Sequence, residues 1–424
     1  MVIAQMIKVC DAIMGSGKST AAINYMNAHP DKKFIYITPY LPEAARIKES
    51  CPTLHFQEPS KALKEFDFKK SLHSNWLIQL SYNISSTHKA FSMYTAETIE
   101  KIKDAHYTLL VDENLSVIEK FDITPGDIDV LIRGGYLKAE GNMIVVGDVP
   151  YDCEYGSGPG KFQSLFMMLK SRHLVRVSRR PGKEEYFFWT LPPELIYAFD
   201  DVIVMTYLFE GSGLEKMFRM YNMPFEYIYV QRDGDDYMFS DHDPDIPEYV
   251  AHLKEMVHIC KDEKLNAVGD KINALSKTWC GDLRHKDQMD QIKRNLYNYF
   301  RFKTDDAGVD KTKRMWSCYK DARFKLRGKG YSNSFAVFNE RATNRYRDRR
   351  VLAYIVNVYM DVEEKRFWEG NGVAVDEEQY ALSIMLQWIW RSAIRDGKEI
   401  WIYIPSRRMR ELLENWIEEV STKC

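Results

Sequence analysis

Residues 10–20 read Cys10-Asp11-Ala12-Ile13-Met14-Gly15-Ser16-Gly17-Lys18-Ser19-Thr20. A short apolar run precedes this stretch, and residues 21–26 after it are typical of a helix. Glycine lets a backbone pass close to phosphate oxygens because it has no Cβ, and the amide groups of such a turn point at the anion. The order of strand, glycine-rich turn, Lys-Ser-Thr and helix therefore predicts a phosphate-binding loop. The alternative is a glycine-containing turn before an ordinary helix.

The residues of this loop have expected roles in binding a nucleotide. Lys18 is expected to reach the β- and γ-phosphates of ATP, and Ser19 to be a ligand of Mg²⁺. The turn and the helix start would surround the phosphates. The predicted nucleotide-binding residues are thus Ala12, Gly15, Ser16, Gly17, Lys18, Ser19 and Thr20.

A second motif, which is acidic, follows about 90 residues after the loop. It is the run Tyr107-Thr108-Leu109-Leu110-Val111-Asp112-Glu113. An apolar strand ends there in two acids. In phosphate-loop ATPases such a strand lies beside the loop; its Asp holds Mg²⁺ through water and its Glu polarises the attacking water. Asp112 is therefore a predicted metal residue and Glu113 a predicted catalytic residue. The alternative is a strand that ends in solvated acids.

Composition limits the class of protein. The chain has 424 residues, 45% of them hydrophobic, a formal net charge of −2 and seven cysteines. No two cysteines form a Cys-x-x-Cys pair, and their wide spacing suits reduced thiols in the cytoplasm. No apolar run approaches the length of a membrane span, so we expect no membrane association.

Strands alternate with helices along both halves of the chain, which predicts an α/β fold with parallel sheets. We expect a first domain over residues 1–212, with an insertion at about 116–185 that we expect to be helical and basic, and a second domain over residues 213–424. Helices are expected over residues 346–360 and 377–394. The second of these would carry Gln387, Arg391 and Arg395 on one face, because they are spaced by four.

A basic segment lies at residues 311–350, where thirteen Lys or Arg stand against three acids with aromatic residues between them. Positive charge with interleaved aromatics suits a sugar-phosphate backbone and stacked bases. The alternative is a solvated helical face.

Taken together, these motifs resemble those of superfamily 2 helicases, in order and over about residues 7–404. Motif I resembles Ala12 to Ser19, and motif Ia resembles Ile37-Thr38-Pro39. A Thr-His pair seen in several members resembles Thr87-His88, and motif II resembles Asp112-Glu113-Asn114-Leu115. Motif III resembles Met205-Thr206-Tyr207 loosely, motif V resembles Arg341-Ala342-Thr343-Asn344, and motif VI resembles Gln387 to Arg395. The residues of motifs V and VI resemble those of helicase-like proteins encoded by bacteriophages.

This resemblance implies two RecA-like domains in tandem that bind ATP and Mg²⁺ between them. Lys18, Glu113, Gln387, Arg391 and Arg395 would be catalytic, with Arg395 favoured over Arg391 as the arginine finger. The implied nucleic-acid contacts are Thr38, Pro39, Thr87, His88, Arg341, Thr343 and Asn344.

The resemblance also implies a function. The implied activity is that of an ATP-dependent helicase or translocase that acts on DNA rather than RNA. It would act in phage DNA replication or recombination, together with other proteins of those processes. The implied location is the cytoplasm of a bacterial host. The alternatives are a terminase-like packaging ATPase and an ATP-switched loader or scaffold that does not unwind.

Overall fold

The computed structural model describes residues 6–60, 62–66, 70–151, 162–180, 183–242, 248–306, 308–339 and 344–422. The chain divides into two compact units. The first comprises Met1–Ala12, Gly17–Pro244 and Asp361–Val375, and the second comprises Ile13–Ser16, Asp245–Met360 and Asp376–Cys424.

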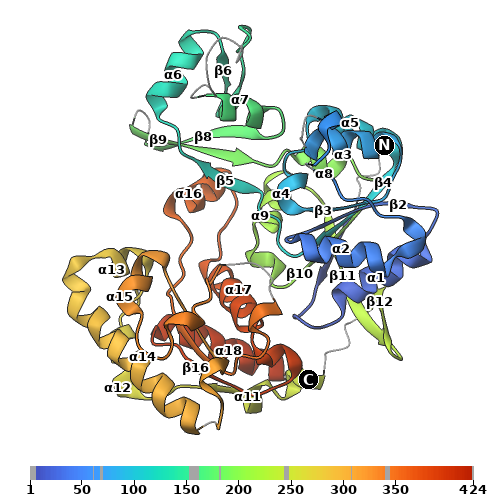
Figure 1. Ribbon diagram of the computed structural model, residues 1–424. Helices are drawn as coiled ribbons and strands as arrows, with labels where there is room; N and C mark the ends of the chain where they lie inside the picture. The colour runs from blue at the N-terminus through green and yellow to red at the C-terminus, as the bar shows by residue number, and fades with distance from the viewer. Residues whose placement is uncertain are drawn as a thin grey trace. The chain divides into compact units, whose positions relative to one another are not determined.

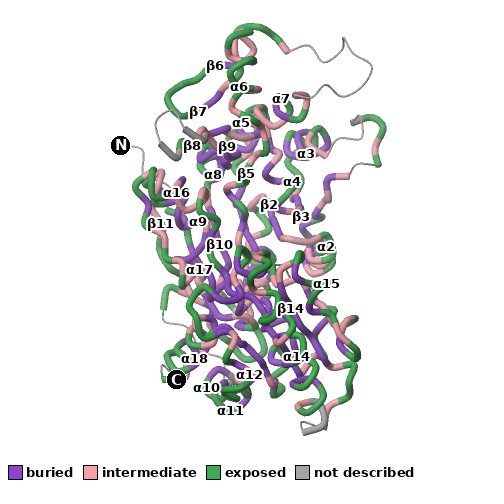
Figure 2. The backbone as a smooth tube through the Cα atoms, turned by 90° about the vertical axis from the view of Figure 1, so that its left-hand side faces the viewer, coloured by how far each residue is buried: buried purple, intermediate pink, exposed green. Residues whose placement is uncertain are grey.

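The first unit is built on a seven-stranded sheet with the order β12-β11-β1-β10-β4-β2-β3 (Figure 1). All neighbours in it are parallel except β11 and β12. The central strands are apolar and buried on both faces, as in other parallel sheets, and Figure 2 shows β2 and β10 as buried. The strands are β1 (Ile7–Asp11), β2 (Lys33–Thr38), β3 (Ile84–Thr87), β4 (Tyr107–Asp112), β10 (Asp201–Thr206), β11 (Phe225–Asp233) and β12 (Asp236–Ser240).

Helices join these strands, and they begin where local sequence favours it. Thr95 and Thr98 form a reciprocal capping box at the start of α5, and Ser212 caps α9 through the Glu215 amide. α1 packs along β12, and α2 packs along β2 and β3. The helices are α1 (Lys18–Ala28), α2 (Leu41–Ser50), α3 (Lys70–Gln79), α4 (His88–Phe91), α5 (Ala96–Ala105), α8 (Pro193–Tyr197) and α9 (Gly213–Met220).

The insertion between β4 and β10 is an antiparallel sheet with a core of its own. Its order is β5-β9-β8-β7-β6, and α6 (Pro125–Arg133) and α7 (Gln163–Leu169) pack on it. We expected a helical insertion, and the five-stranded sheet with the eight-residue strands β8 and β9 shows that this expectation was wrong. The strands are β5 (Ile118–Phe121), β6 (Leu137–Glu140), β7 (Met143–Val146), β8 (His173–Arg180) and β9 (Lys183–Thr190).

A helix from the second half of the chain also belongs to the first unit. α16 (Val362–Gly370) is capped by Asp361 and packs against β8. Phe367 contacts Phe188 with ring centroids 5.7 Å apart, and Lys120 lies 3.4 Å from the Glu363 carboxylate. The insertion is therefore stabilised by residues 179 and 243 positions away from their partners in the sequence.

The second unit contains a four-stranded parallel sheet with the order β13-β16-β15-β14. One core cluster joins α14 to β14, β15 and β16, with Ile292, Leu296, Trp316 and Ala353 fully buried. The strands are β13 (Val257–Ile259), β14 (Arg314–Cys318), β15 (Val351–Ile355) and β16 (Ile400–Tyr403). The helices are α10 (Glu248–Ala251), α11 (Leu253–Met256), α12 (Glu263–Asn266), α13 (Lys277–Gly281), α14 (Lys286–Asp306), α15 (Arg323–Leu326), α17 (Glu377–Ile389) and α18 (Arg407–Thr422).

The predicted α/β class with a parallel sheet in each half is confirmed, but the limits of its parts differ from those expected. We expected the first domain to end at residue 212, whereas β11 and β12 extend the first sheet and the units divide after Pro244. The helix expected over residues 346–360 is wrong, because Val351–Ile355 forms the fully buried strand β15. Among the described helices, none has the length and apolar character needed to cross a membrane.

Candidate nucleotide-binding site

The phosphate loop leaves the carboxyl end of β1 and leads directly into α1. Gly15 and Gly17 have φ angles of 86° and 89°, which residues with a Cβ rarely adopt. The Ser16 amide donates to the Ile13 carbonyl at 3.2 Å, which closes the turn. The Ser16 hydroxyl is buried and has no hydrogen-bond partner among the described residues. The loop thus holds a buried polar group that a ligand oxygen can satisfy.

Lys18 is the first residue of α1, and its amine donates a hydrogen bond to the Ala12 carbonyl across the loop. Burial lowers the pKa of Lys18, although the nearby Cys10, Asp112, Asp11 and Glu113 act in the opposite direction. A buried amine is stabilised by an anion placed beside it. Lys18 is therefore well suited to a phosphate group.

Asp112 lies at the carboxyl end of β4, two strands away from the loop. β10 lies between β1 and β4, so the expectation that this acid stands on the strand beside the loop was wrong. The Asp112 carboxylate accepts a hydrogen bond from the Tyr36 hydroxyl at 2.9 Å. Burial raises the pKa of Asp112, and both the Tyr36 bond and Lys18 oppose the rise. A cation would offset the cost of this buried carboxylate.

Glu113 follows Asp112 in a strained conformation. Its φ angle is 63°, and its amide donates to the Met205 carbonyl of β10 at 2.8 Å. Non-glycine residues with positive φ are uncommon and persist where surrounding contacts hold them, often at functional sites. The pairing with β10 thus fixes the direction in which the Glu113 side chain leaves the sheet.

The sequence reasoning missed Asp11, which immediately precedes the loop. One carboxylate oxygen of Asp11 accepts from the Phe209 amide at 3.0 Å, and burial raises the pKa of this group. Phe209 follows Leu208, which has a φ angle of 55°. Asp11 therefore links the phosphate loop to the turn after β10. An acidic residue directly before the loop could have marked Asp11 as a site residue. Its hydrogen-bond partner, Phe209, lies almost 200 residues later and could not be identified from the sequence.

Tyr237 of β12 was also missed, and it lies against Gly17. A Cβ built on Gly17 would stand 2.2 Å from the Tyr237 ring. The hairpin of β11 and β12 is held there because Asn24 of α1 donates to the Tyr237 carbonyl at 3.0 Å. No sequence pattern near the loop indicates this contact. Position 17 consequently requires glycine both for its φ angle and for space.

We expect Gly17→Ala to destabilise the first unit more than an ordinary glycine substitution does. The positive φ costs about 1–2 kcal/mol, and the clash with Tyr237 adds about 1–3 kcal/mol of overpacking. The measurement is the denaturant midpoint of the transition assigned to the first unit. Gly141→Ala is the matched control, because Gly141 has a φ of 64° with nothing within 4 Å of its Cβ. Equal destabilisation by the two variants would contradict the contact with Tyr237.

The predicted nucleic-acid contacts lie in different environments. Thr38 at the end of β2 and His88 at the start of α4 are buried, and a ring nitrogen of His88 lies 2.8 Å from the Asp112 carbonyl oxygen. The Thr87 hydroxyl accepts from the Ala90 amide at 3.3 Å and so caps α4. Pro39 and Thr87 are half-buried. Arg341 and Thr343 lie outside the described residues, and Asn344 begins a short 3₁₀ turn, Asn344–Tyr346.

The predicted arginine residues belong to the second unit, where the helix that carries them is shorter than expected. α17 ends at Ile389, and Ser392 adopts an extended conformation while its hydroxyl donates to the Ile389 carbonyl at 2.6 Å. Gln387, Arg391 and Arg395 therefore do not share one helix face. Arg391 is buried and donates to the Val337 carbonyl at 2.7 Å, whereas Arg395 is exposed in the 3₁₀ turn Ala393–Asp396.

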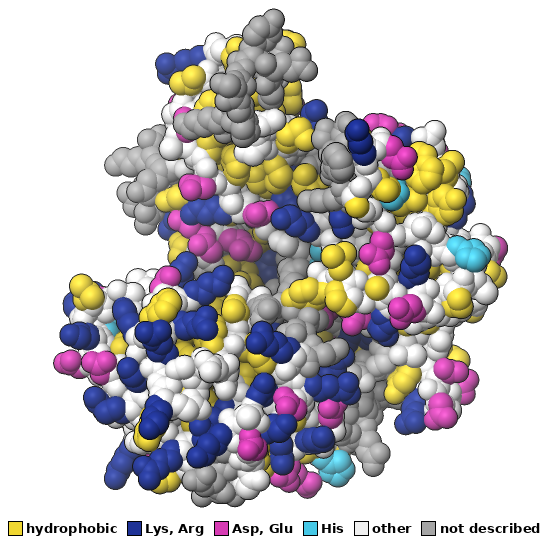
Figure 3. All heavy atoms as spheres, in the orientation of Figure 1, with side chains coloured by type: hydrophobic (Ala, Val, Ile, Leu, Met, Phe, Trp, Pro, Cys, Tyr) yellow, Lys and Arg dark blue, Asp and Glu magenta, His cyan; other side chains and the backbone are white. Residues whose placement is uncertain are grey.

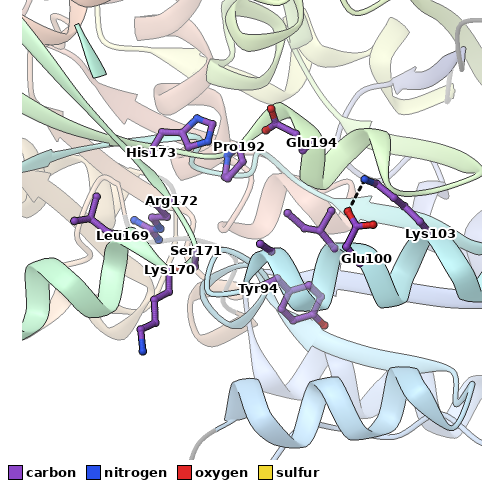
Figure 4. Close-up of a pocket in the computed structure, with 12 residues that line it drawn as sticks. Tyr94, Glu100, Lys103, Leu169, Lys170, Ser171, Arg172, His173, Pro192 and Glu194 are labelled. Carbon is purple, nitrogen blue, oxygen red and sulfur yellow. Dashed lines mark hydrogen bonds and ion pairs between the residues drawn. The ribbon is translucent and has the colours of Figure 1, made fainter. Parts of the chain in front are cut away.

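A cavity of about 270 Å³ lies where the insertion meets α5 (Figure 4). Three of its charged residues already have partners. Lys103 is 2.7 Å from Glu100, and Arg172 reaches the Ser92 carbonyl at 3.1 Å and Glu119 at 2.7 Å. Arg172 thus joins the insertion to the end of α4, and we assign this region a structural role.

Comparison with known proteins identifies one relative along the whole chain. The chain is 35% identical to the SPbeta prophage-derived protein YonV of Bacillus subtilis (strain 168) over 421 residues, which are 97% of this chain and 98% of that protein. A family model described as the YonV C-terminal Rossmann-like domain matches residues 251–417.

Several solved structures resemble the chain at low sequence identity. Xpd4 of S. tokodaii matches 97% of this chain and 94% of its own, with 12% identity and a TM-score of 0.46. The DUF1998 helicase MrfA bound to DNA matches 94% of this chain and 46% of its own, with 10% identity and a TM-score of 0.30. A DEAD box protein from Methanococcus jannaschii matches 99% of this chain and 87% of its own, with 10% identity and a TM-score of 0.27.

Proposed function

The chain belongs to the family of the prophage-derived YonV protein, and we propose that it is an ATP-dependent helicase or translocase that acts on DNA. The observation that carries this proposal is the arrangement at one edge of the first sheet. Lys18 and Ser19 begin the helix after β1. Asp112 ends β4 in the same parallel sheet, and Glu113 follows it. Parallel α/β sheets bind ligands at the carboxyl ends of their strands.

The residues of this edge fit a nucleoside triphosphate with a divalent cation. The Ser16 hydroxyl and the Lys18 amine are buried polar groups that phosphate oxygens would satisfy. Ser19 and Asp112 would hold Mg²⁺, which neutralises charge on the phosphate oxygens when it is bound. Glu113 would orient the attacking water and accept its proton.

For the arginine finger, we retain Arg395 ahead of Arg391. Arg391 is buried, and its guanidinium is bound to the Val337 carbonyl, so its movement would break a hydrogen bond. Arg395 is exposed. An arginine finger supplied by the same chain stabilises charge on the transferring phosphoryl group. The origin of the relative in a prophage supports a role in phage DNA replication or recombination.

The decisive experiment measures ATP hydrolysis with a panel of nucleic acids. We expect single-stranded or forked DNA to stimulate hydrolysis several-fold over the protein alone, and single-stranded RNA to stimulate it less. Unwinding of duplexes with 3′ and 5′ tails then distinguishes a helicase from a translocase. A rate that no nucleic acid changes would contradict the proposal and would favour an ATP-switched scaffold.

A further inference from the structure

Residues 320–330 form a strongly basic surface on the second unit, here called the α15 surface. Lys320, Arg323, Lys325, Arg327 and Lys329 are exposed, and the one exposed acid is Asp321, so five positive charges face one negative charge. None of the five cations forms an ion pair with another described residue. Figure 3 shows Lys and Arg side chains gathered over the face that carries α13, α14 and α15. Such a surplus of charge attracts an acidic ligand.

Phe324 stands in the middle of this surface with 72% of its area exposed. The segment cannot rotate to bury it, because Ala322 and Leu326 already face the core and are 1% and 0% exposed. The Tyr331 hydroxyl also donates to the Leu326 carbonyl at 2.6 Å, which fixes the end of α15. An exposed phenylalanine side chain forgoes the free energy of its burial, and the contacts of this segment give no reason for the exposure.

Two arginines of this surface lie over aromatic rings. The Arg327 guanidinium is 5.1 Å from the Phe324 ring centre, and the Arg323 guanidinium is 4.3 Å from the Phe335 ring centre. Arg327 directly follows α15, and its contact with the Phe324 ring places the two side chains on one side of the segment. The surface therefore presents a planar ring next to planar guanidinium groups, and nucleic-acid bases stack on both kinds of group.

We propose that the α15 surface binds single-stranded nucleic acid, with Phe324 as a stacking platform for a base. Lys320, Lys325, Arg327 and Lys329 contact the phosphates on either side of that base. A single strand fits better than a duplex, because bases in a duplex are stacked on each other and leave no face for Phe324. An acidic protein would satisfy the charges but has no need of an exposed aromatic ring.

This inference rests on the proposed action on nucleic acid, and it is tested by equilibrium binding without ATP. Fluorescence anisotropy with labelled oligo-dT compares wild type with Phe324→Ala, which should weaken binding about 5- to 150-fold through loss of one stacked base. Phe324→Trp should restore binding. An abasic oligonucleotide of equal length should bind wild type and Phe324→Ala equally. Arg327→Gln should lower the slope of log K against log salt concentration by about 0.7.

Matched substitutions exclude general effects on the surface. Leu283→Ala removes an apolar side chain that is 81% exposed in the same unit, and Arg284→Gln removes an exposed arginine already paired with Asp282. Both should leave oligo-dT affinity unchanged. The proposal is overturned if Phe324→Ala binds oligo-dT as wild type does, or if Phe324→Ala weakens binding of poly-glutamate instead. A wild-type protein whose ATPase responds to DNA while Phe324→Ala binds normally would retain the proposed function and lose only this inference.

Discussion

Lys18→Ala should reduce ATP hydrolysis by about 10²- to 10³-fold, the usual cost of removing one group that stabilises transition-state charge. The amine is buried in the loop and has a lowered pKa without a ligand. A triphosphate beside it would favour the charged form of the amine, so that binding and catalysis both use the same group. ATP affinity should therefore fall together with the rate. Single-turnover hydrolysis and nucleotide binding measured on the same preparation test this.

The control for this variant is Lys8→Ala, because Lys8 lies on the same strand β1 but is exposed. It should leave hydrolysis unchanged. Lys18→Ala should also fold normally, since it removes a buried amine whose hydrogen bond is to the Ala12 carbonyl of its own loop. Hydrolysis by Lys18→Ala at the wild-type rate would rule out the phosphate loop as the catalytic site.

The sequence predicted the phosphate loop and the acidic strand end because each is a contiguous segment whose chemistry is local. The glycines with positive φ lie within three residues of the helix start at Lys18, and Asp112 directly ends its own apolar strand. Strand order is not local. β10 comes about 90 residues after β4, yet it pairs between β1 and β4. No spacing in the sequence carries that information.

The errors in secondary structure have a common physical origin. Residues 346–360 combine charged and apolar residues in a way that suits a helix. However, Val351–Ile355 lies in a buried run that continues to Val358, and the parallel pairing with β14 and β16 decides its form. Tertiary pairing overrides local propensity in such short segments. Arg341 and Thr343, which were predicted to contact nucleic acid, lie outside the described residues, so these contacts stay predictions.

Long-range contacts were also invisible in the sequence. Tyr237 meets Gly17 across 220 positions, and Asp11 binds the Phe209 amide across 198 positions. Each partner lies on a strand or turn that looks ordinary by itself. The sequence therefore offers candidate residues for the nucleotide site, but it does not indicate the residues that hold them in place.

Glu113→Gln should lower the turnover number by about 10²- to 10⁴-fold, the range expected for loss of a general base. The φ of 63° and the amide bond to Met205 fix the backbone, so glutamine should leave the sheet in the same direction as glutamate. Because Lys18, Ser19 and Asp112 are untouched, ATP should bind with nearly unchanged affinity. A lower kcat with unchanged affinity is the pattern of a group that acts only in the transition state.

This separation of rate from affinity distinguishes Glu113 from Lys18 within one site. Glu49→Gln is the matched control, because Glu49 is exposed on α2 of the same unit and should not affect the rate. If DNA binding depends on bound ATP, Glu113→Gln should hold the DNA-binding state longer than wild type, since hydrolysis that ends this state is slow. Equal loss of ATP affinity in Glu113→Gln and Lys18→Ala would instead make Glu113 a part of the binding site, and the water would need another base.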